Sequence, residues 1–371
     1  MQITVLCKVV DNFGDIGVVY RLSKQLKKIN PQNNINLVVD DLVSFNKICS
    51  AVQCDVPVQE VEGLNVYSWN EAEFCHEAFS RDDGELMPVI LECFQCGRPD
   101  WMERILFEEK LQRIVHIIMI DYLTAEKYAE DFHCLQSLTR SAKVQKVNFM
   151  PGFTEHTGGL VIEEEWREVP ERKADGPVLV FTYERDWKEL VEGLVKGVFD
   201  RLNHRRILVA QGRGKESFMA AVKSCGADNL VEELPYLNQT EWDKVMKSCS
   251  ALVIRGEESM SRACLSGIPF IWHAYPQGDE YQLVKVRALL ERMRRHFEPS
   301  DFEIVERAWL DINSPSEPSL RGAERRSNPY SAFFSAVDRL APSFYDFALS
   351  LRKNGDLAAN LMTYIEKLAI I

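Results

Sequence analysis

Short apolar, β-branched runs alternate along this chain with longer segments of helical spacing, and this alternation limits the possible folds more than any other feature. Residues 2–10 form the first such run, and residues 18–29 follow it with apolar positions spaced as on one face of a helix. Repeated strand, helix, strand order requires parallel strands that are covered on both faces. The sequence therefore predicts an α/β fold built on parallel sheets.

The alternation forms two successive series, separated by the charged, proline-containing residues 163–177. Further strands are expected at residues 34–39, 86–94, 114–120, 178–182, 206–211, 230–234, 251–254 and 269–272. A domain usually takes about 100–200 residues, so 371 residues have room for two. We predict two facing Rossmann-like domains, residues 1–170 and 171–350, with ligands in the cleft outside the carboxyl ends of their strands.

The charge of the chain disfavours some partners. The formal net charge is -12, and such a chain binds nucleic acid poorly because phosphate contacts need clustered Lys and Arg. An acidic surface suits a basic protein partner, although solubility alone also accounts for it. No basic segment of a signal peptide opens the chain, and no apolar run approaches the roughly 18 residues of a membrane span. We expect a cytoplasmic protein without membrane contact.

Ten cysteines are scattered through the chain, and Cys93 and Cys96 form a C-x-x-C pair. A structural zinc site needs a second pair at suitable spacing, and none is evident. Packing of buried thiols is the favoured interpretation, and a metal or redox role is the alternative.

Two carboxylates, Asp11 and Asp15, lie on a glycine-bearing loop directly after the first strand. The carboxyl end of a strand is where α/β proteins bind ligands. The pair can therefore converge on one substrate, and one of the two can act as a general base. The alternative, equally consistent with the residues, is that Asp15 only caps the following helix.

A second candidate site is the segment Arg255-Gly256-Glu257-Glu258-Ser259, where a strand ends and the helix expected at residues 259–266 begins. Unpaired N–H groups at a helix start bind phosphate. The alternative is that the two glutamates only complement the helix dipole, and they would repel a diphosphate unless they turn away or bind sugar hydroxyls. Residues 211–215 match neither glycine-rich nucleotide fingerprint and are interpreted as a turn.

Five segments, in the same order between residues 5 and 290, resemble the EarP family of arginine rhamnosyltransferases, which modify translation elongation factor P. They are residues 7–17 (CKVVDNFGDIG), 121–126 (DYLTAE), 151–160 (PGFTEHTGGL), 255–259 (RGEES) and 272–277 (WHAYPQ). Five co-linear segments are far more specific than any one of them.

The resemblance implies a GT-B fold with no metal at the reaction centre and no cofactor. It implies transfer of rhamnose from TDP-β-L-rhamnose to one arginine of elongation factor P with inversion, so that the factor relieves ribosome stalling at proline runs. It also implies that residues 1–170 hold the acceptor protein and residues 171–350 the nucleotide sugar. A helix in residues 351–371 is expected to return to the first domain.

The functional residues of the family map onto this chain one by one. Asp15 corresponds to the general base, and Asp11 and Phe13 to residues that hold the acceptor. The donor-binding positions correspond to Tyr183, Gln239, Glu257, Glu258 and Ser259. Glu257 is also a catalytic candidate, whereas Glu258 stands where the family has Asp and reaches one methylene further.

Three other functions fit parts of the pattern. A GT-B nucleotide-sugar transferase with a different acceptor would keep the fold and the donor site. A non-catalytic relative would bind the sugar nucleotide without turnover, but it has less need of Asp11, Asp15 and Glu257. An NAD-dependent oxidoreductase is disfavoured because no G-x-G-x-x-G follows the first strand.

Overall fold

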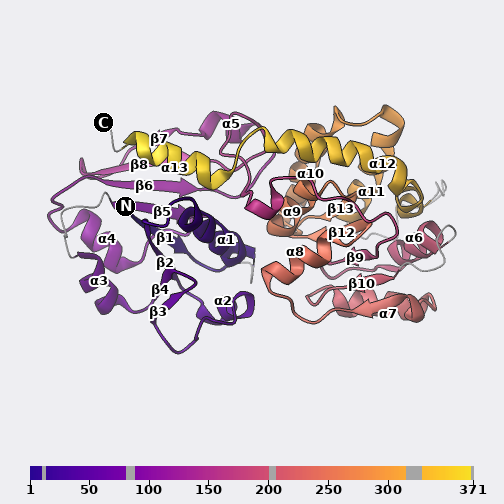
Figure 1. Cartoon of the computed structure of the whole chain (residues 1–371), viewed down its shortest axis with the longest axis horizontal. Coiled ribbons are helices and arrows are strands. Elements are labelled where there is room, and N and C mark those ends of the chain that lie inside the picture. The colour runs from indigo at the N-terminus through magenta and orange to yellow at the C-terminus, as the bar shows by residue number, and fades with distance from the viewer. Residues whose placement is uncertain (11–13, 81–87, 200–205, 315–327, 369–371) are drawn as a thin grey trace. The chain divides into compact units, whose positions relative to one another are not determined.

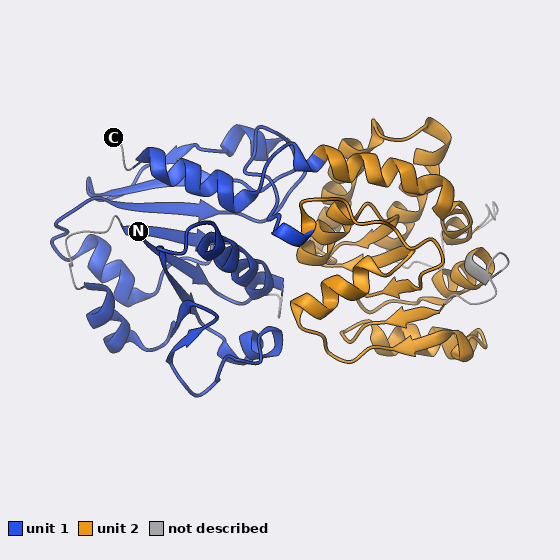
Figure 2. Ribbon diagram, viewed as in Figure 1, with its two compact units in different colours: residues 1–165, 351–371 blue, residues 166–350 orange. Residues whose placement is uncertain are grey.

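The computed structural model describes residues 1–10, 14–80, 88–199, 206–314 and 328–368. The chain forms two compact units (Figure 2): unit 1 contains residues 1–165 and 351–371, and unit 2 contains residues 166–350. Each unit contains one sheet of mainly parallel strands with helices packed against it (Figure 1). The expected α/β fold on parallel sheets is confirmed.

Unit 1 contains an eight-stranded sheet with the order β3-β4-β2-β1-β5-β6-β8-β7. Neighbouring strands are parallel except β3 with β4 and β7 with β8, the pairs at the two edges. The strands are β1 (Gln2–Cys7), β2 (Asn34–Val39), β3 (Val58–Val61), β4 (Leu64–Ser68), β5 (Pro88–Cys93), β6 (Val115–Ile120), β7 (Gln136–Ser137) and β8 (Val144–Phe149).

Helices cover both faces of this sheet. They are α1 (Gly14–Ile29), α2 (Leu42–Ile48), α3 (Ala72–Ser80), α4 (Asp100–Phe107), α5 (Tyr128–Phe132) and α13 (Leu357–Leu368). Along β6, Ile118 belongs to a core with α1 and α13, whereas Ile117 belongs to a second core with α3 and α4. Successive side chains of a strand point to opposite faces, so burial on both faces explains why β6 is apolar except at His116.

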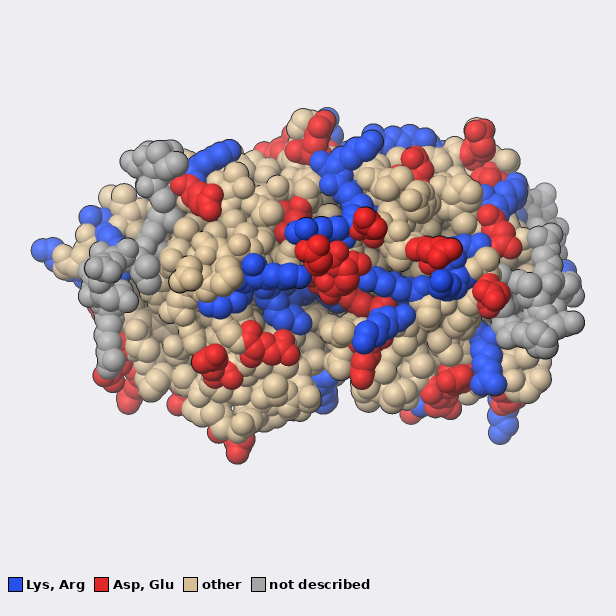
Figure 3. All heavy atoms as spheres, in the orientation of Figure 1, with Lys and Arg blue, Asp and Glu red and all other residues tan. Residues whose placement is uncertain are grey.

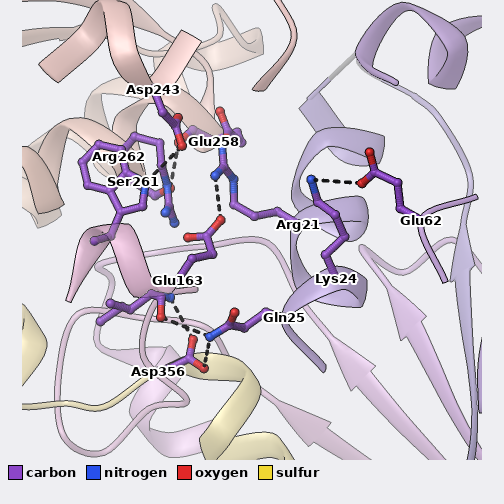
Figure 4. Close-up of polar contacts among 12 residues, drawn as sticks. Arg21, Lys24, Gln25, Glu62, Glu163, Asp243, Glu258, Ser261, Arg262 and Asp356 are labelled. Atoms are coloured by element: carbon purple, nitrogen blue, oxygen red, sulfur yellow. Dashed lines mark hydrogen bonds and ion pairs between the residues drawn. The ribbon is translucent and has the colours of Figure 1, made fainter. Parts of the chain in front are cut away.

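The last segment of the chain completes the core of unit 1. Gln25 of α1 donates through Nε2 to Oδ2 of Asp356 at 3.2 Å, and the N–H of Ile162 donates to Oδ1 of Asp356 at 2.8 Å (Figure 4). Burial raises the pKa of the Asp356 carboxyl, and these hydrogen bonds oppose that shift. From there α13 packs against α1 and adds its apolar face to the core: Leu357, Ala358, Leu361, Met362 and Ile365.

Unit 2 contains a five-stranded, fully parallel sheet with the order β11-β10-β9-β12-β13. Its strands are β9 (Val178–Val180), β10 (Ile207–Val209), β11 (Val231–Glu233), β12 (Ala251–Arg255) and β13 (Phe270–His273). Its helices are α6 (Lys188–Phe199), α7 (Lys215–Ser224), α8 (Gln239–Lys247), α9 (Glu257–Ser266), α10 (Tyr281–Arg294), α11 (Pro299–Asn313) and α12 (Pro329–Arg352), with short 3-10 helices at Asp228–Leu230 and Gly278–Glu280. A further 3-10 helix, Glu164–Trp166, lies at the boundary between the two units.

Two boundaries differ from the sequence expectation for physical reasons. The strand expected at residues 2–10 ends at Cys7, because the next N–H groups bind side chains and not a neighbouring strand. The chain passes from unit 1 to unit 2 after Glu165, whereas the expected boundary is residue 170. Trp166 already belongs to unit 2, since its Nε1 donates to Oδ2 of Asp243 at 3.0 Å.

Charged side chains of both signs are interspersed on the face drawn in Figure 3, so the acidic excess does not form one uniform field there. In the described part of the chain, no helix combines the length and the apolarity needed to cross a membrane.

Candidate functional site

In unit 1, the candidate residues lie at the carboxyl edge of the sheet. Asp15 is only 4% exposed, and its Oδ2 accepts a hydrogen bond from the N–H of Val10 at 2.9 Å. Asp40, directly after β2, accepts one from the N–H of Val9 at 2.8 Å. The two carboxylates hold the backbone where the loop after β1 begins, and Asp15 lies inside the first turn of α1, which starts at Gly14.

Asp11 and Phe13, the two remaining acceptor-site candidates, lie outside the described residues. Their predicted roles therefore stay predictions that rest on the family resemblance. The fixed backbone at Val9 and Val10 places the start of their loop at the carboxyl end of β1.

Three cysteines also lie at this edge of the sheet. Cys7 and Cys93 end the neighbouring strands β1 and β5, and Cys96 follows closely. Burial raises the pKa of each thiol, that of Cys96 to about 12, so the thiols stay protonated and are poor nucleophiles. No group of three or more His, Cys, Asp and Glu within the described ranges is placed to hold a metal ion. The burial of these protonated thiols favours the packing interpretation of the C-x-x-C pair.

In unit 2, an arginine and several rings meet at the carboxyl edge of the sheet. Arg255 ends β12 and lies opposite His273, the last residue of β13. Its guanidinium carbon lies 4.4 Å from the ring centre of Phe181 and 4.6 Å from that of Tyr183. The ring of Tyr183 also meets the half-exposed ring of Tyr275 edge-on at 5.3 Å. We call these five residues the cationic platform.

His273 has a structural role in this platform. Burial, together with the nearby Arg185 and Arg255, lowers its pKa to about 3, so the ring is neutral at physiological pH. Its Nδ1 accepts a hydrogen bond from the N–H of Tyr183 at 3.2 Å. A ring in this state orients the Tyr183 loop and is a poor acid or base near neutral pH.

The start of α9 adjoins Arg255. Gly256 caps the helix with a φ of 76°, a conformation that other residues rarely adopt. Glu257 follows, and its Oε1 lies 3.1 Å from Nζ of Lys285 on α10. Ser259, at 7% exposed, lies in the same first turn. Arg255 and Lys285 therefore offset the negative charge of the acidic residues in this turn.

The backbone of Glu258 also has a partner within α9. Its carbonyl accepts a hydrogen bond from Oγ of Ser261 at 2.7 Å (Figure 4). The structure therefore places Glu257, Glu258 and Ser259 together on one helical turn next to the platform.

The glycine-rich turn between β10 and α7 packs against the platform. A Cβ added at Gly212 would lie 3.0 Å from the Phe181 ring and 3.3 Å from the guanidinium of Arg255. One added at Gly214 would lie 2.4 Å from the carbonyl oxygen of Thr182. The turn expected at residues 211–215 is present, and its glycines permit this close approach.

Gln239 lies on a different element, as the first residue of α8 after the N-cap Asn238. One turn later, Trp242 meets the ring of Phe181 at 5.1 Å, and Phe181 in turn stacks on Arg255. Gln239 therefore stands on the helix that packs against the platform.

Sequence reasoning omitted several charged residues from the site. Arg255 was inside a recognised motif, and its place as the last residue of a strand was the signal that could have identified it. Lys285 is far from Glu257 in sequence, and no local pattern links them. Arg185, whose Nη1 donates to the carbonyl of Ile312 at 2.6 Å, likewise gave no sequence signal.

Comparison with known proteins decides the family. Residues 3–366 match the family described as elongation factor P (EF-P) rhamnosyltransferase EarP. The chain belongs to the EarP family. This membership makes it a glycosyltransferase, and its two parallel sheets with their helices form the GT-B fold.

Relatives agree with the family assignment, and a solved structure agrees with the fold. The chain is 28% identical to the protein-arginine rhamnosyltransferase of Shewanella oneidensis, over 86% of this chain and 91% of the relative. It is also 28% identical to that of Pseudomonas aeruginosa, over 84% and 86% of the two chains. A structure described as the basis for EarP-mediated arginine glycosylation of EF-P matches over 99% of both chains, with a TM-score of 0.57 and 17% identity.

Proposed function

We propose that this chain transfers L-rhamnose from TDP-β-L-rhamnose to one arginine of translation elongation factor P, with inversion of the anomeric centre. The observation that carries the proposal is the family match over residues 3–366, nearly the whole chain. The modified factor would then relieve ribosomes stalled at proline runs, so we place the reaction in the cytoplasm.

The cationic platform and the start of α9 suit a nucleoside diphosphate. Backbone N–H groups at a helix start and the guanidinium of Arg255 attract its phosphates. The rings of Tyr183 and Tyr275 offer faces for the base or the sugar. We assign Gln239, Glu257, Glu258 and Ser259 to contacts with the same donor, and Glu257 additionally to the reacting sugar. With these cations in place, we propose a reaction that uses no metal ion or other cofactor.

Asp15 is the proposed general base. A guanidinium has a pKa above about 12 and is a poor nucleophile while protonated. An aspartate carboxylate with an ordinary pKa of about 3.9 cannot deprotonate it in advance. Asp15 therefore takes the proton while the nitrogen bonds to the anomeric carbon and the bond from that carbon to the diphosphate oxygen breaks. The leaving diphosphate keeps the electron pair and is stabilised at the start of α9.

Asp11 and Phe13 are assigned to the acceptor. A second carboxylate beside Asp15 would orient the planar guanidinium through paired hydrogen bonds, a geometry that arginine favours. The phenyl ring of Phe13 would shape the surface next to it.

The test is the intact mass of purified elongation factor P after incubation with this protein and TDP-β-L-rhamnose. A gain of one deoxyhexose is expected, and it should disappear when the target arginine of the factor is replaced by lysine. No gain while the donor still binds, measured by calorimetry, would reject elongation factor P as the acceptor and favour a GT-B transferase with another acceptor.

A further inference from the structure

A cavity of about 290 Å³ lies in unit 1, away from the candidate catalytic loop. Its lining comes from the first residues of β6 and β8, from β7 and the loop to β8, and from the last turn of α13, which Figure 1 shows lying over these strands. Strands β1, β5, β6 and β8 are parallel. The start of β6 therefore lies at the amino ends of these strands, whereas the end of β1 lies at their carboxyl ends. Asp15 is therefore not part of this cavity.

His116 is the most informative residue of the lining. It is 8% exposed and alternates along β6 with Ile118, which packs with α13, so its ring is directed to the α13 face. Within the described residues its imidazole makes no hydrogen bond and no ion pair. Burial lowers its pKa, which leaves a neutral ring with one donor and one acceptor nitrogen. The ring nitrogens face the open cavity, and the described chain supplies no partner for them.

The rest of the lining is suited to a ring with a polar group. Val147 and Leu368 are apolar, and Tyr364 adds an aromatic ring. The hydroxyls of Tyr364 and Ser137 make no hydrogen bond to the described part of the chain and can accept or donate. Among the residues described, no acidic side chain lines the cavity.

The volume of the cavity limits what it can contain. A water molecule takes a share of about 30 Å³ of liquid volume, and ligand pockets begin at about 300 Å³. A cavity of about 290 Å³ therefore holds either several waters or one molecule of the size of a substituted ring.

We propose that this cavity is a binding site for a small uncharged phenol, separate from the transferase site. The ring would contact Val147, Leu368 and Tyr364, and the phenolic hydroxyl would donate to the unprotonated nitrogen of His116. A cation would find no carboxylate there. An anion would find no unpaired cation, because the imidazole is neutral and the ammonium of Lys146 lies 3.8 Å from the carboxylate of Glu92.

The probe is 4-ethylphenol, titrated into the full-length protein by calorimetry and by NMR of the histidine rings. We expect saturable binding of one molecule per chain and a shifted His116 signal. His116→Leu should weaken binding at least about tenfold, the worth of one buried hydrogen bond. The matched control is His156→Leu, since His156 has a side chain 68% exposed and lies outside the cavity lining.

His116→Leu should fold normally, because it replaces a buried polar group without a protein partner by an apolar one. If it does not fold, Leu368→Trp provides a second test, because a larger side chain at the end of α13 fills the cavity and should abolish binding. The proposal is overturned by no saturable binding up to the solubility limit. Equal affinity in His116→Leu and the unchanged protein, or crystals with only ordered water against His116, would also overturn it. Transferase activity is not a readout, so the result is independent of the proposed function.

Discussion

At the carboxyl edge of the sheet in unit 1, the side chains that hold the loop are the carboxylates of Asp15 and Asp40. At the carboxyl edge in unit 2, the corresponding place is taken by Arg255 between two aromatic rings, with Lys285 beside the start of α9. The candidate site of unit 1 therefore holds carboxylates alone among its named charges, whereas that of unit 2 combines the cations Arg255 and Lys285 with the carboxylates Glu257 and Glu258. The proposed function uses this difference, because it assigns the cationic acceptor to unit 1 and the anionic donor to unit 2.

The largest effect is expected from removing the carboxylate of unit 1. Asp15→Asn keeps an oxygen that can accept from Val10 but cannot take a proton, so the rate of transfer should fall at least about a hundredfold. Affinity for TDP, measured by calorimetry, should not change, because the nucleotide is assigned to unit 2. Asp40→Asn is the matched control and should stay within a few-fold of the unchanged protein. Near-full activity of Asp15→Asn would show that Asp15 is not the general base.

The second variant removes the cation of unit 2. Arg255→Gln should weaken TDP binding about thirtyfold, which corresponds to about 2 kcal/mol for lost charge-assisted hydrogen bonds. The control is Arg206→Gln, which removes an exposed arginine just before β10, at the amino ends of the parallel strands. Equal TDP affinity in both variants would show that the platform does not bind the diphosphate.

The third variant tests whether His273 has a structural role in the cationic platform. The pKa of His273 is lowered to about 3 in the folded protein, so below pH 6.5 the unfolded chain binds a proton that the folded chain does not. Stability should therefore fall as pH decreases from 6.5 towards 3, by about 2 kcal/mol for this group between pH 7 and pH 5. The free energy of unfolding, measured with urea at pH 7 and pH 5, should fall by about 2 kcal/mol less in His273→Asn than in the unchanged protein. The exposed His156→Asn should behave like the unchanged protein, and an equal loss in all three would contradict this account.

The smallest effect is expected at the first turn of α9. Ser259→Ala should weaken TDP binding about fivefold, the worth of one hydrogen bond of about 1 kcal/mol. Ser224→Ala, at the end of α7, is the control and should bind TDP normally. Unchanged TDP affinity in Ser259→Ala would remove the hydroxyl from the donor site while leaving the contribution of Arg255 intact.

The sequence predicted most of the buried parallel strands because both of their faces are covered, which produces apolar runs such as residues 251–254 of β12. It did not predict β3, β4, β7 or β8. The first three are short and lie at or near the edges of the sheet, and in β8 polar residues separate Val144, Val147 and Phe149, so none of the four has an apolar run to detect. The antiparallel pairing at the edges of unit 1 was missed for the same reason.

For the site, the sequence singled out Asp15 because it lies between β1 and the body of α1, and Glu257 because it begins the helix after β12, and their roles stay predictions. The contact of Glu257 with Lys285 and the stacking of Arg255 on Phe181 could not be predicted, since these join separate elements of the chain. The end of β1 could not be placed either, because the side chains of Asp40 and Asp15 stop the strand after Cys7.

The return of α13 to unit 1 has a consequence for the order of folding during synthesis. The ribosome releases residues 1–165 first, yet their core lacks Leu361 and Ile365 until almost the whole chain has emerged. Unit 2, by contrast, is continuous and can close as soon as its last helix is made. The unit that is translated first is therefore the one completed last, and the apolar face that α13 covers stays incomplete until then.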